Sequence, residues 1–261
     1  MSSPRCLVIE NDPTDDPREL GEWLTQAGIE LDVLRPYAGA ALPEDLTGYD
    51  ALVVLGGGQQ AYAEPGEPWF GTVRSLLRKA VRFDVPTLGI CLGAQLLAQA
   101  HGGTVAPAAA GPEIGARLVA KRDAAERDPL FRPLPLLPDV VQWHHDEVTE
   151  LPAGAVLLAA STHYPHQAFR IGGSAWGLQF HIECDAAMVA RWAANDRAVL
   201  DQLGTTPEEV VASVEQVLDD IFEVWHPFAV RFAALVRGEL PRPDPVAPAP
   251  APGRELPLFG G

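Results

Sequence analysis

The chain has 261 residues, of which 47% are hydrophobic, and its formal net charge is −16. This length is enough for one large or two small packed domains with a sizeable core. The acidic excess argues against nucleic acids and anionic membranes as partners, because both attract clustered Lys and Arg. No apolar run reaches the roughly 18 residues of a membrane span, and the first residues lack the basic-then-apolar layout of a signal peptide.

The use of cysteine points to a reducing compartment. Cys6, Cys91 and Cys184 cannot form a closed disulfide framework, so we expect a cytoplasmic protein with free thiols. Cys6 lies inside an apolar run and is interpreted as a core residue. Cys184 is interpreted as structural rather than as a second nucleophile.

Short β-rich runs alternate with helical patterns in the first half of the chain. This order and spacing are typical of βαβ units, which build a parallel sheet with helices on both faces. We therefore predict an α/β fold with a doubly wound, mostly parallel sheet. Strands are predicted over residues 5–9, 29–34, 51–55 and 85–90, and helices over residues 17–27, 68–82 and 92–101.

The second half changes character, because short loops rich in Pro and Gly join its apolar runs. These runs predict an extension of the sheet that is partly antiparallel. Strands are predicted over residues 114–121, 140–143, 155–160, 167–171 and 175–182, and helical stretches over residues 185–203 and 207–237. We expect a kink or break of the last helix at Trp225-His226-Pro227.

These patterns divide the chain into three predicted parts. An α/β domain is expected over residues 1–203, a C-terminal helical extension over 204–238, and a disordered tail rich in Pro and Ala over 239–261. The extension carries an apolar stripe at helical spacing. Packing of this stripe on the chain's own core is favoured over a role in assembly.

A candidate nucleophile lies where the fourth predicted strand meets the next helix. Cys91 is flanked by Gly89 and Gly93, and a strand-to-helix nucleophile turn needs such small neighbours. The helix N-terminus favours a thiolate, and the amide of Leu92 can stabilise an oxyanion. The alternative is a buried, unreactive thiol. The paired glycines favour the nucleophile.

The predicted strand over residues 175–182 supplies a base and a carboxylate. Side chains alternate along a strand, so Gln179, His181 and Glu183 project from the face opposite the apolar one. This spacing lets a carboxylate orient the imidazole of a general base. A solvated polar face is the alternative, and the upstream Cys91 favours the catalytic interpretation.

Three glycines, Gly56 to Gly58, end the third predicted strand. Glycines at the carboxyl end of a parallel strand let the backbone approach a ligand closely. A phosphate-binding loop is disfavoured because the Lys and Ser/Thr of a P-loop are missing. A plain tight turn remains the alternative.

Histidines gather in the second half of the chain but lack metal-ligand spacing. His144, His145, His163 and His166 show neither an HExxH nor a CxxC pattern. We therefore predict no metal site. The polar segment over residues 143–147 is expected to line the pocket instead.

These segments, in this order, resemble the class I, or triad, glutamine amidotransferase family. The matching stretches are the three glycines, residues 89–95 around Cys91, and residues 179–183. The resemblance covers roughly residues 5–200, and it is strongest to free-standing members similar to the glutaminase domain of GMP synthase. It implies a flavodoxin-like fold.

The resemblance also implies roles for individual residues. Cys91 would be the nucleophile, His181 the general base and acid, and Glu183 the carboxylate that orients His181. The backbone amides of Gly57 and Leu92 would form the oxyanion hole. The glutamine substrate would be held by Gln95 and by the backbone near His145 and Asp146.

Two positions depart from the family pattern. Ile182 follows the triad histidine where Pro is usual, and Gly58-Gln59 stands where Gly-Pro is frequent. Ile182 keeps the strand pattern, so we expect the triad to persist. The second departure concerns the shape of the loop rather than its oxyanion role.

The leading hypothesis is a glutaminase that passes ammonia to a separate synthase partner, and no cofactor is expected. A γ-glutamyl hydrolase or peptidase with the same triad is the second hypothesis. A non-catalytic regulatory protein on this fold is the third, and the intact Cys, His and Glu set argues against it.

Overall fold

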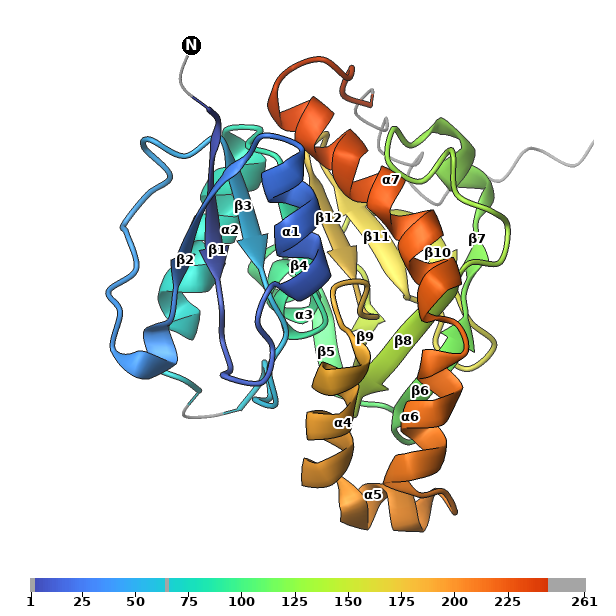
Figure 1. Cartoon of the computed structure of the whole chain (residues 1–261). Coiled ribbons are helices and arrows are strands. Elements are labelled where there is room, and N and C mark those ends of the chain that lie inside the picture. The colour runs from blue at the N-terminus through green and yellow to red at the C-terminus, as the bar shows by residue number, and fades with distance from the viewer. Residues whose placement is uncertain (1–2, 64–65, 244–261) are drawn as a thin grey trace, which may run out of the picture.

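The computed structural model describes residues 3–63 and 66–243 (Figure 1). Eight strands form one sheet in the order β2-β1-β3-β4-β12-β11-β10-β7. Neighbours from β2 to β12 run parallel, and those from β12 to β7 run antiparallel. The predicted α/β fold, with a parallel sheet and an antiparallel extension, is confirmed. Residues 244–261 of the predicted tail lie outside the described residues.

The strands are short and many are fully buried. Those of the main sheet are β1 Arg5–Ile9, β2 Glu30–Leu34, β3 Ala51–Val54, β4 Thr87–Ile90, β7 Ala120–Lys121, β10 Val156–Ala160, β11 Ala168–Ile171 and β12 Ala175–Leu178. Two small antiparallel pairs stand apart from it: β5 Thr104–Pro107 with β9 Asp146–Glu150, and β6 Glu113–Leu118 with β8 Asp139–His144.

Helices cover both faces of the sheet. The helices α1 Arg18–Gln26 and α7 Leu218–Val236 share one apolar cluster with the sheet. The helices α2 Phe70–Arg82 and α3 Leu92–Ala100 share the other. Side chains of β1 alternate between the two clusters, as strand geometry requires. Strands covered on both faces are apolar throughout rather than alternating, as in β3, and the neighbouring β4 is fully buried although it contains Thr87.

The helical stretches are more divided than the sequence predicted. The stretch over residues 185–203 forms α4 Ala186–Asn195 and α5 Arg197–Gln202, and the stretch over 207–237 forms α6 Pro207–Glu215 and α7. The break lies at Gln216 and Val217 and not at Pro227, which α7 contains. Trp225 and Phe228, on either side of Pro227, are fully buried, and their packing offsets the hydrogen bond that the proline cannot donate.

The apolar stripe of the C-terminal helices is buried within the chain. Val210 and Val214 of α6 and Ile221 of α7 belong to the cluster that α7 shares with the sheet. This agrees with packing on the chain's own core. Among the described residues, no helix is both long and apolar enough to cross a membrane.

Two strand predictions were wrong in detail, and two short strands were missed. The strand expected over residues 114–121 is two strands, because β6 pairs with β8 while β7 pairs with β10. The strand over 175–182 ends at Leu178, where the chain leaves the sheet and His181 bridges to Val141 of β8. The short strands β5 and β9 were not predicted, because they contain Pro107 and several acidic residues, which are infrequent in strands.

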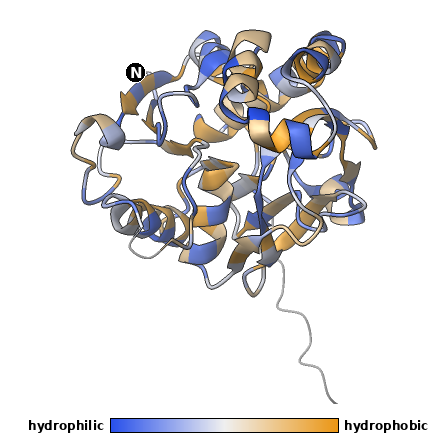
Figure 2. Cartoon of the chain, turned by 90° about the horizontal axis from the view of Figure 1, so that it is seen from below, coloured by the Kyte–Doolittle hydropathy of each residue, from blue (hydrophilic) through white to orange (hydrophobic). Residues whose placement is uncertain are grey.

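Four loops meet at the carboxyl ends of neighbouring strands. They follow β1, β3, β4 and β12, which are adjacent in the sheet. Figure 2 views the molecule from this side and shows orange, hydrophobic central strands surrounded by helices with mixed blue and orange segments. In open α/β sheets, ligands bind at this edge. The predicted glycine turn, Cys91 and His181 all lie in these loops.

Candidate active site

Cys91 occupies a strained turn between β4 and α3. Its φ of 48° and ψ of −107° form a combination that side-chain-bearing residues rarely adopt. No residue separates it from either element, since β4 ends at Ile90 and α3 begins at Leu92. The thiol therefore stands at the N-terminus of a helix and is 5% exposed. Backbone strain of this kind persists only where the surroundings enforce it.

The glycines around Cys91 are required by close packing. A Cβ on Gly89 would lie 2.7 Å from the backbone of Gly93. A Cβ on Gly93 would collide with the backbone carbonyl of Val54 in β3. The first turn of α3 thus lies directly on two strands with no side chain between them. A larger residue at either position would push the helix away and displace Cys91.

His181 and Glu183 form a buried pair. His181 Nδ1 lies 2.6 Å from Glu183 Oε1, and each side chain is 1% exposed. The backbone N–H of Ile182 donates a hydrogen bond to Glu183 Oε2 at 2.9 Å, which fixes the carboxylate. With Nδ1 engaged, Nε2 is the ring nitrogen left for proton transfer.

The surroundings of His181 favour its charged form. Burial would lower the pKa of His181, but the charge of Glu183 and hydrogen bonds with Cys91 and Glu183 raise it well above its usual value. The ring of Trp192 packs against the imidazole with 4.6 Å between ring centroids. Gln179 Nε2 lies 3.7 Å from Cys91 Sγ. These groups hold the thiol and the imidazole in one water-poor site.

Gly57 and Leu92, the two predicted oxyanion-hole residues, are neighbours. A Cβ on Gly57 would lie 3.0 Å from Leu92 Cδ2 and would collide with the side-chain oxygen of Gln59. Leu92 is the first residue of α3, so its amide lacks an acceptor within the helix. Free backbone donors thus occur beside the thiol.

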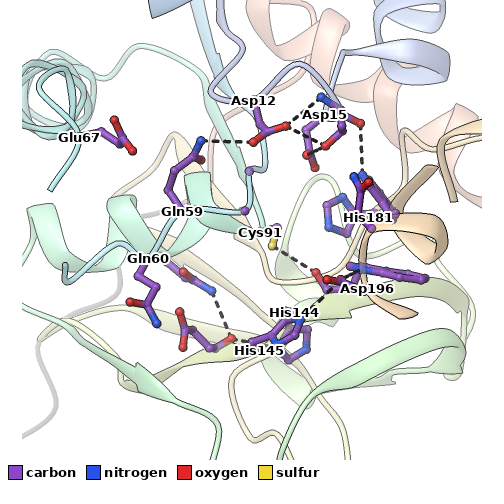
Figure 3. A pocket seen from close by; sticks show the side chains of 18 of the residues that line it. Asp12, Asp15, Gln59, Gln60, Glu67, Cys91, His144, His145, His181 and Asp196 are labelled. Atoms are coloured by element: carbon purple, nitrogen blue, oxygen red, sulfur yellow. Dashed lines mark hydrogen bonds and ion pairs between the residues drawn. The ribbon is translucent and has the colours of Figure 1, made fainter. Parts of the chain in front are cut away.

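A cleft of about 660 Å³ opens at Cys91 (Figure 3). This volume lies within the usual range for small-molecule sites. Of the predicted site residues, the cleft is lined by Gly57, Cys91, Gln95, His145, Asp146 and His181. Leu92 and Glu183 adjoin these residues without lining it. The structure therefore brings every predicted site residue to one place.

Two of the predicted substrate-binding residues, Gln95 and Asp146, are joined by a hydrogen bond. Gln95 Nε2 donates hydrogen bonds to the backbone oxygen of Asp146 at 3.2 Å and to Gln179 Oε1 at 3.3 Å. His145 is half-buried, and its Nε2 lies 3.6 Å from Asp196 Oδ2. A hydrogen bond with Asp196 raises the pKa of His145. These hydrogen bonds fix the side chain of Gln95 at the cleft, whereas the side chain of His145 is paired with Asp196.

One wall of the cleft was not predicted from the sequence. This wall is the loop after β1, from which Asp12, Thr14 and Asp15 line the cleft. Figure 3 shows Asp12 and Asp15 on this wall. Burial raises the pKa of Asp15 from its usual 3.8 to about 7, although the charge of His181 opposes the shift. A signal was present, because a polar, acidic run directly follows a buried strand.

The other histidines have structural partners or face solvent. His144 Nδ1 lies 3.0 Å from the Asp146 backbone oxygen, and its Nε2 lies 3.1 Å from Glu113 Oε2. His166 Nδ1 lies 2.7 Å from a backbone oxygen of β9, and His163 is exposed. Within residues 3–63 and 66–243, no three His, Cys, Asp or Glu side chains are grouped as metal ligands would be.

The remaining thiols differ from Cys91 in their surroundings. Cys6 and Cys184 are free and fully buried. Burial raises the pKa of both thiols, which keeps them protonated. Cys91 is the cysteine that lines the cleft.

Comparison with known proteins agrees with this geometry. Residues 19–188 match the family model described as glutamine amidotransferase class-I. The chain belongs to the class I glutamine amidotransferase family. The glutamine amidotransferase-like protein YfeJ of Salmonella typhimurium is 33% identical over 165 residues, which cover 62% of this chain and 68% of YfeJ.

Other relatives carry different names. Gamma-glutamyl peptidase 4 of Arabidopsis thaliana is 32% identical over 163 residues, covering 61% of this chain and 64% of that protein. A subunit of the glutamine-hydrolysing GMP synthase of Thermococcus kodakarensis is 40% identical over 114 residues, covering 43% of this chain and 58% of that protein. The matched region thus spans less than two thirds of these two relatives.

A solved structure supports the fold over nearly the whole chain. The crystal structure of a glutamine amidotransferase from Thermotoga maritima has a TM-score of 0.79 and 29% identity, and it covers 89% of this chain and 99% of that one. The resemblance to class I amidotransferases similar to the glutaminase domain of GMP synthase is therefore confirmed.

Proposed function

We propose that the protein hydrolyses γ-glutamyl amides, with glutamine as the simplest substrate, through a Cys91, His181 and Glu183 triad. The observation that carries the proposal is the buried pair of His181 and Glu183, 2.6 Å apart, beside a thiol in a strained turn. A nucleophile, a base and an orienting carboxylate in this order are what covalent catalysis requires.

The reaction runs through a thioester. His181 takes the proton of Cys91, and the thiolate attacks the side-chain amide carbon of the substrate. The backbone amides of Gly57 and Leu92 hold the oxyanion. The C–N bond then breaks, and the amine leaves with the proton from His181. This leaves a γ-glutamyl thioester, which a water activated by His181 hydrolyses to glutamate and the free thiol.

Gln95, Asp146 and His145 are proposed to hold the glutamyl end of the substrate. Gln95 and Asp146 are joined by a hydrogen bond and both line the cleft. Ammonia released from glutamine would serve a separate synthase, as the name of the Thermococcus kodakarensis relative suggests. The need for a reduced Cys91 favours a cytoplasmic location.

A second candidate is the hydrolysis of substituted γ-glutamyl amides. Two observations favour it: the relative named gamma-glutamyl peptidase, and a cleft whose lining extends well beyond the triad to Glu67 and Asn195. A third candidate is a non-catalytic regulator. This function would not require the strained turn at Cys91 or the buried pair of His181 and Glu183.

An ammonia-release assay with glutamine tests the proposal, with γ-glutamyl dipeptides assayed in parallel for glutamate release. We expect the wild-type protein to cleave at least one of these substrates, and Cys91→Ala and His181→Ala to lose the activity while remaining folded. Full activity of Cys91→Ala would refute the mechanism. Failure of Cys91 to react with a glutamine-like electrophile would favour the non-catalytic candidate.

A further inference from the structure

We infer that the preferred substrate is a γ-glutamyl amide whose leaving amine carries a second, positively charged amino group, which the loop after β1 binds through Asp12 and Asp15. This inference rests on the proposed function and specifies its substrate class. It concerns the part of the cleft that receives the leaving group.

The position of Asp15 identifies the leaving-group side. If Gly56 had a Cβ, Asp15 Oδ1 would lie 2.7 Å from it and His181 Cε1 would lie 3.1 Å from it. The carboxylate and the imidazole edge therefore approach the same point. His181 protonates the leaving nitrogen, so whatever that nitrogen carries emerges beside Asp15. Figure 3 shows Asp12 and Asp15 together on this side of Cys91.

This wall has more hydrogen-bond acceptors than donors. Asp12 Oδ1 accepts a hydrogen bond from the Thr14 backbone N–H at 2.9 Å, and Asp12 Oδ2 accepts one from Gln59 Nε2 at 3.3 Å. The Thr14 hydroxyl lies within 3.0 Å of both Asp12 Oδ1 and Asp15 Oδ2, and its single hydrogen can serve one of them at a time. Asp15 Oδ1 accepts no hydrogen bond from any described residue, and Asp15 is 6% exposed. The buried oxygen Oε1 of Gln59, also in the cleft, has no partner among the described residues.

Histidines are the only basic side chains among the described residues beside these carboxylates, and they have partners already: His181 faces Asp15 but is paired with Glu183, and His145 is paired with Asp196. The cleft is lined by Asp12, Asp15, Glu67, Asp146 and Asp196, and the described residues that line it include no Lys or Arg. Arg18, in the same loop region, is turned to Asp16 at 2.7 Å and to Asp185 at 3.0 Å. The cleft lining thus carries an excess of negative charge, which favours a cationic ligand. An alkylammonium group supplies one positive charge and three donors.

The titratable groups around Asp15 determine how its charge responds to pH. The groups that face Asp15 are His181, Glu183, Asp12 and Cys184, of which only His181 can carry positive charge. Burial raises the pKa of Asp15 to about 7. A bound ammonium would favour its ionised form, so preference for a cationic substrate should weaken as the pH falls below neutrality.

Three γ-glutamyl amides of similar length test the inference. Their leaving groups are 1,4-diaminobutane, which is cationic, 4-amino-1-butanol, which is neutral, and 4-aminobutyrate, which is anionic. Glutamate release gives kcat/KM for each. In every case the C–N bond breaks and the amine departs with the proton of His181. We expect the cationic amide to exceed the neutral one by about tenfold or more at low salt, and the anionic amide to be the poorest.

Variants of the loop then locate the preference. Asp12→Asn and Asp15→Asn are each expected to reduce the ratio of cationic to neutral kcat/KM by about tenfold. Asp16→Asn removes the same charge from the same loop, but Asp16 does not line the cleft, so the ratio should not change. Asp12→Lys should invert the order in favour of the anionic amide. This inversion cannot come from loss of folding.

The outcomes separate the inference from the proposed function. Equal kcat/KM values for the three amides, or a cationic preference that survives in both Asn variants, would overturn the inference and leave the γ-glutamyl hydrolase intact. Inertness of all three amides and of glutamine would overturn both.

Discussion

The buried carboxyl of Asp15 should make the folded state less stable as the pH rises. Burial raises its pKa from 3.8 to about 7, so the folded protein keeps a proton that the unfolded chain has already released. The contribution of this protonated carboxyl to the stability of the folded state is complete below the pKa of Asp15 in the unfolded chain. It is lost as the pH rises through the pKa of Asp15 in the folded protein. At about 1.4 kcal/mol for each pKa unit, the full penalty above neutrality is about 4 kcal/mol.

Asp15→Asn removes this penalty while keeping an oxygen that the Thr14 hydroxyl can reach. We expect the variant to be more stable than the wild type near pH 8. Its advantage there should exceed that near pH 5 by about 3 kcal/mol, because at the lower pH the folded carboxyl is still protonated. Comparing the two proteins cancels the titration of other groups.

Urea unfolding followed by tryptophan fluorescence, at both pH values, measures the effect. Asp16→Asn serves as the control, because Asp16 is partly exposed and pairs with Arg18. Asp16→Asn should change the free energy of unfolding by nearly the same amount at the two pH values. An Asp15→Asn protein with no greater advantage at pH 8 than at pH 5 would refute the argument from burial.

Three further predictions concern the turn and the triad. Glu183→Gln should reduce kcat by about a thousandfold or more. It should also move the high-pH limb of the rate profile to lower pH, because the pKa of His181 falls without the carboxylate. A high-pH limb that does not move would contradict this role of Glu183. Gly93→Ala should lower the free energy of unfolding by about 3 kcal/mol, because its Cβ would collide with β3. Gly71→Ala should raise the free energy of unfolding by about 0.5 kcal/mol, because its Cβ would contact nothing. Equal urea midpoints for the two variants would contradict the close packing at Gly93. A thiol reagent should modify Cys91 alone in the native protein, and rapid loss of Cys184 would count against its burial.

Local patterns predicted which residues gather at the cleft better than they predicted the ends of helices and strands. The glycines around Cys91 and the close spacing of His181 and Glu183 are encoded within a few residues, so both were visible in the sequence, although the strand expected to carry His181 ends at Leu178. The ends of helices and strands depend on distant partners. The strand before His181 ends early because that residue bridges to β8, and the last helix continues through Pro227 because buried aromatic residues hold it.

The position of the acidic run after β1 was visible in the sequence, but its place beside the triad was not, for a related reason. Asp15 matters because folding brings it beside Gly56 and His181, which are far from it in the sequence. No short motif records that proximity. The boundary at residue 203 between domain and extension stays a prediction, although α6 and α7 share the core of the sheet.

Mass spectrometry of the protein quenched during turnover tests the central claim most directly. With glutamine or a γ-glutamyl amide as substrate, we expect a γ-glutamyl adduct on the peptide that contains Cys91, and neither adduct nor turnover in Cys91→Ala. Continued hydrolysis by Cys91→Ala, or an adduct on Cys6 or Cys184 in its place, would contradict the proposed mechanism.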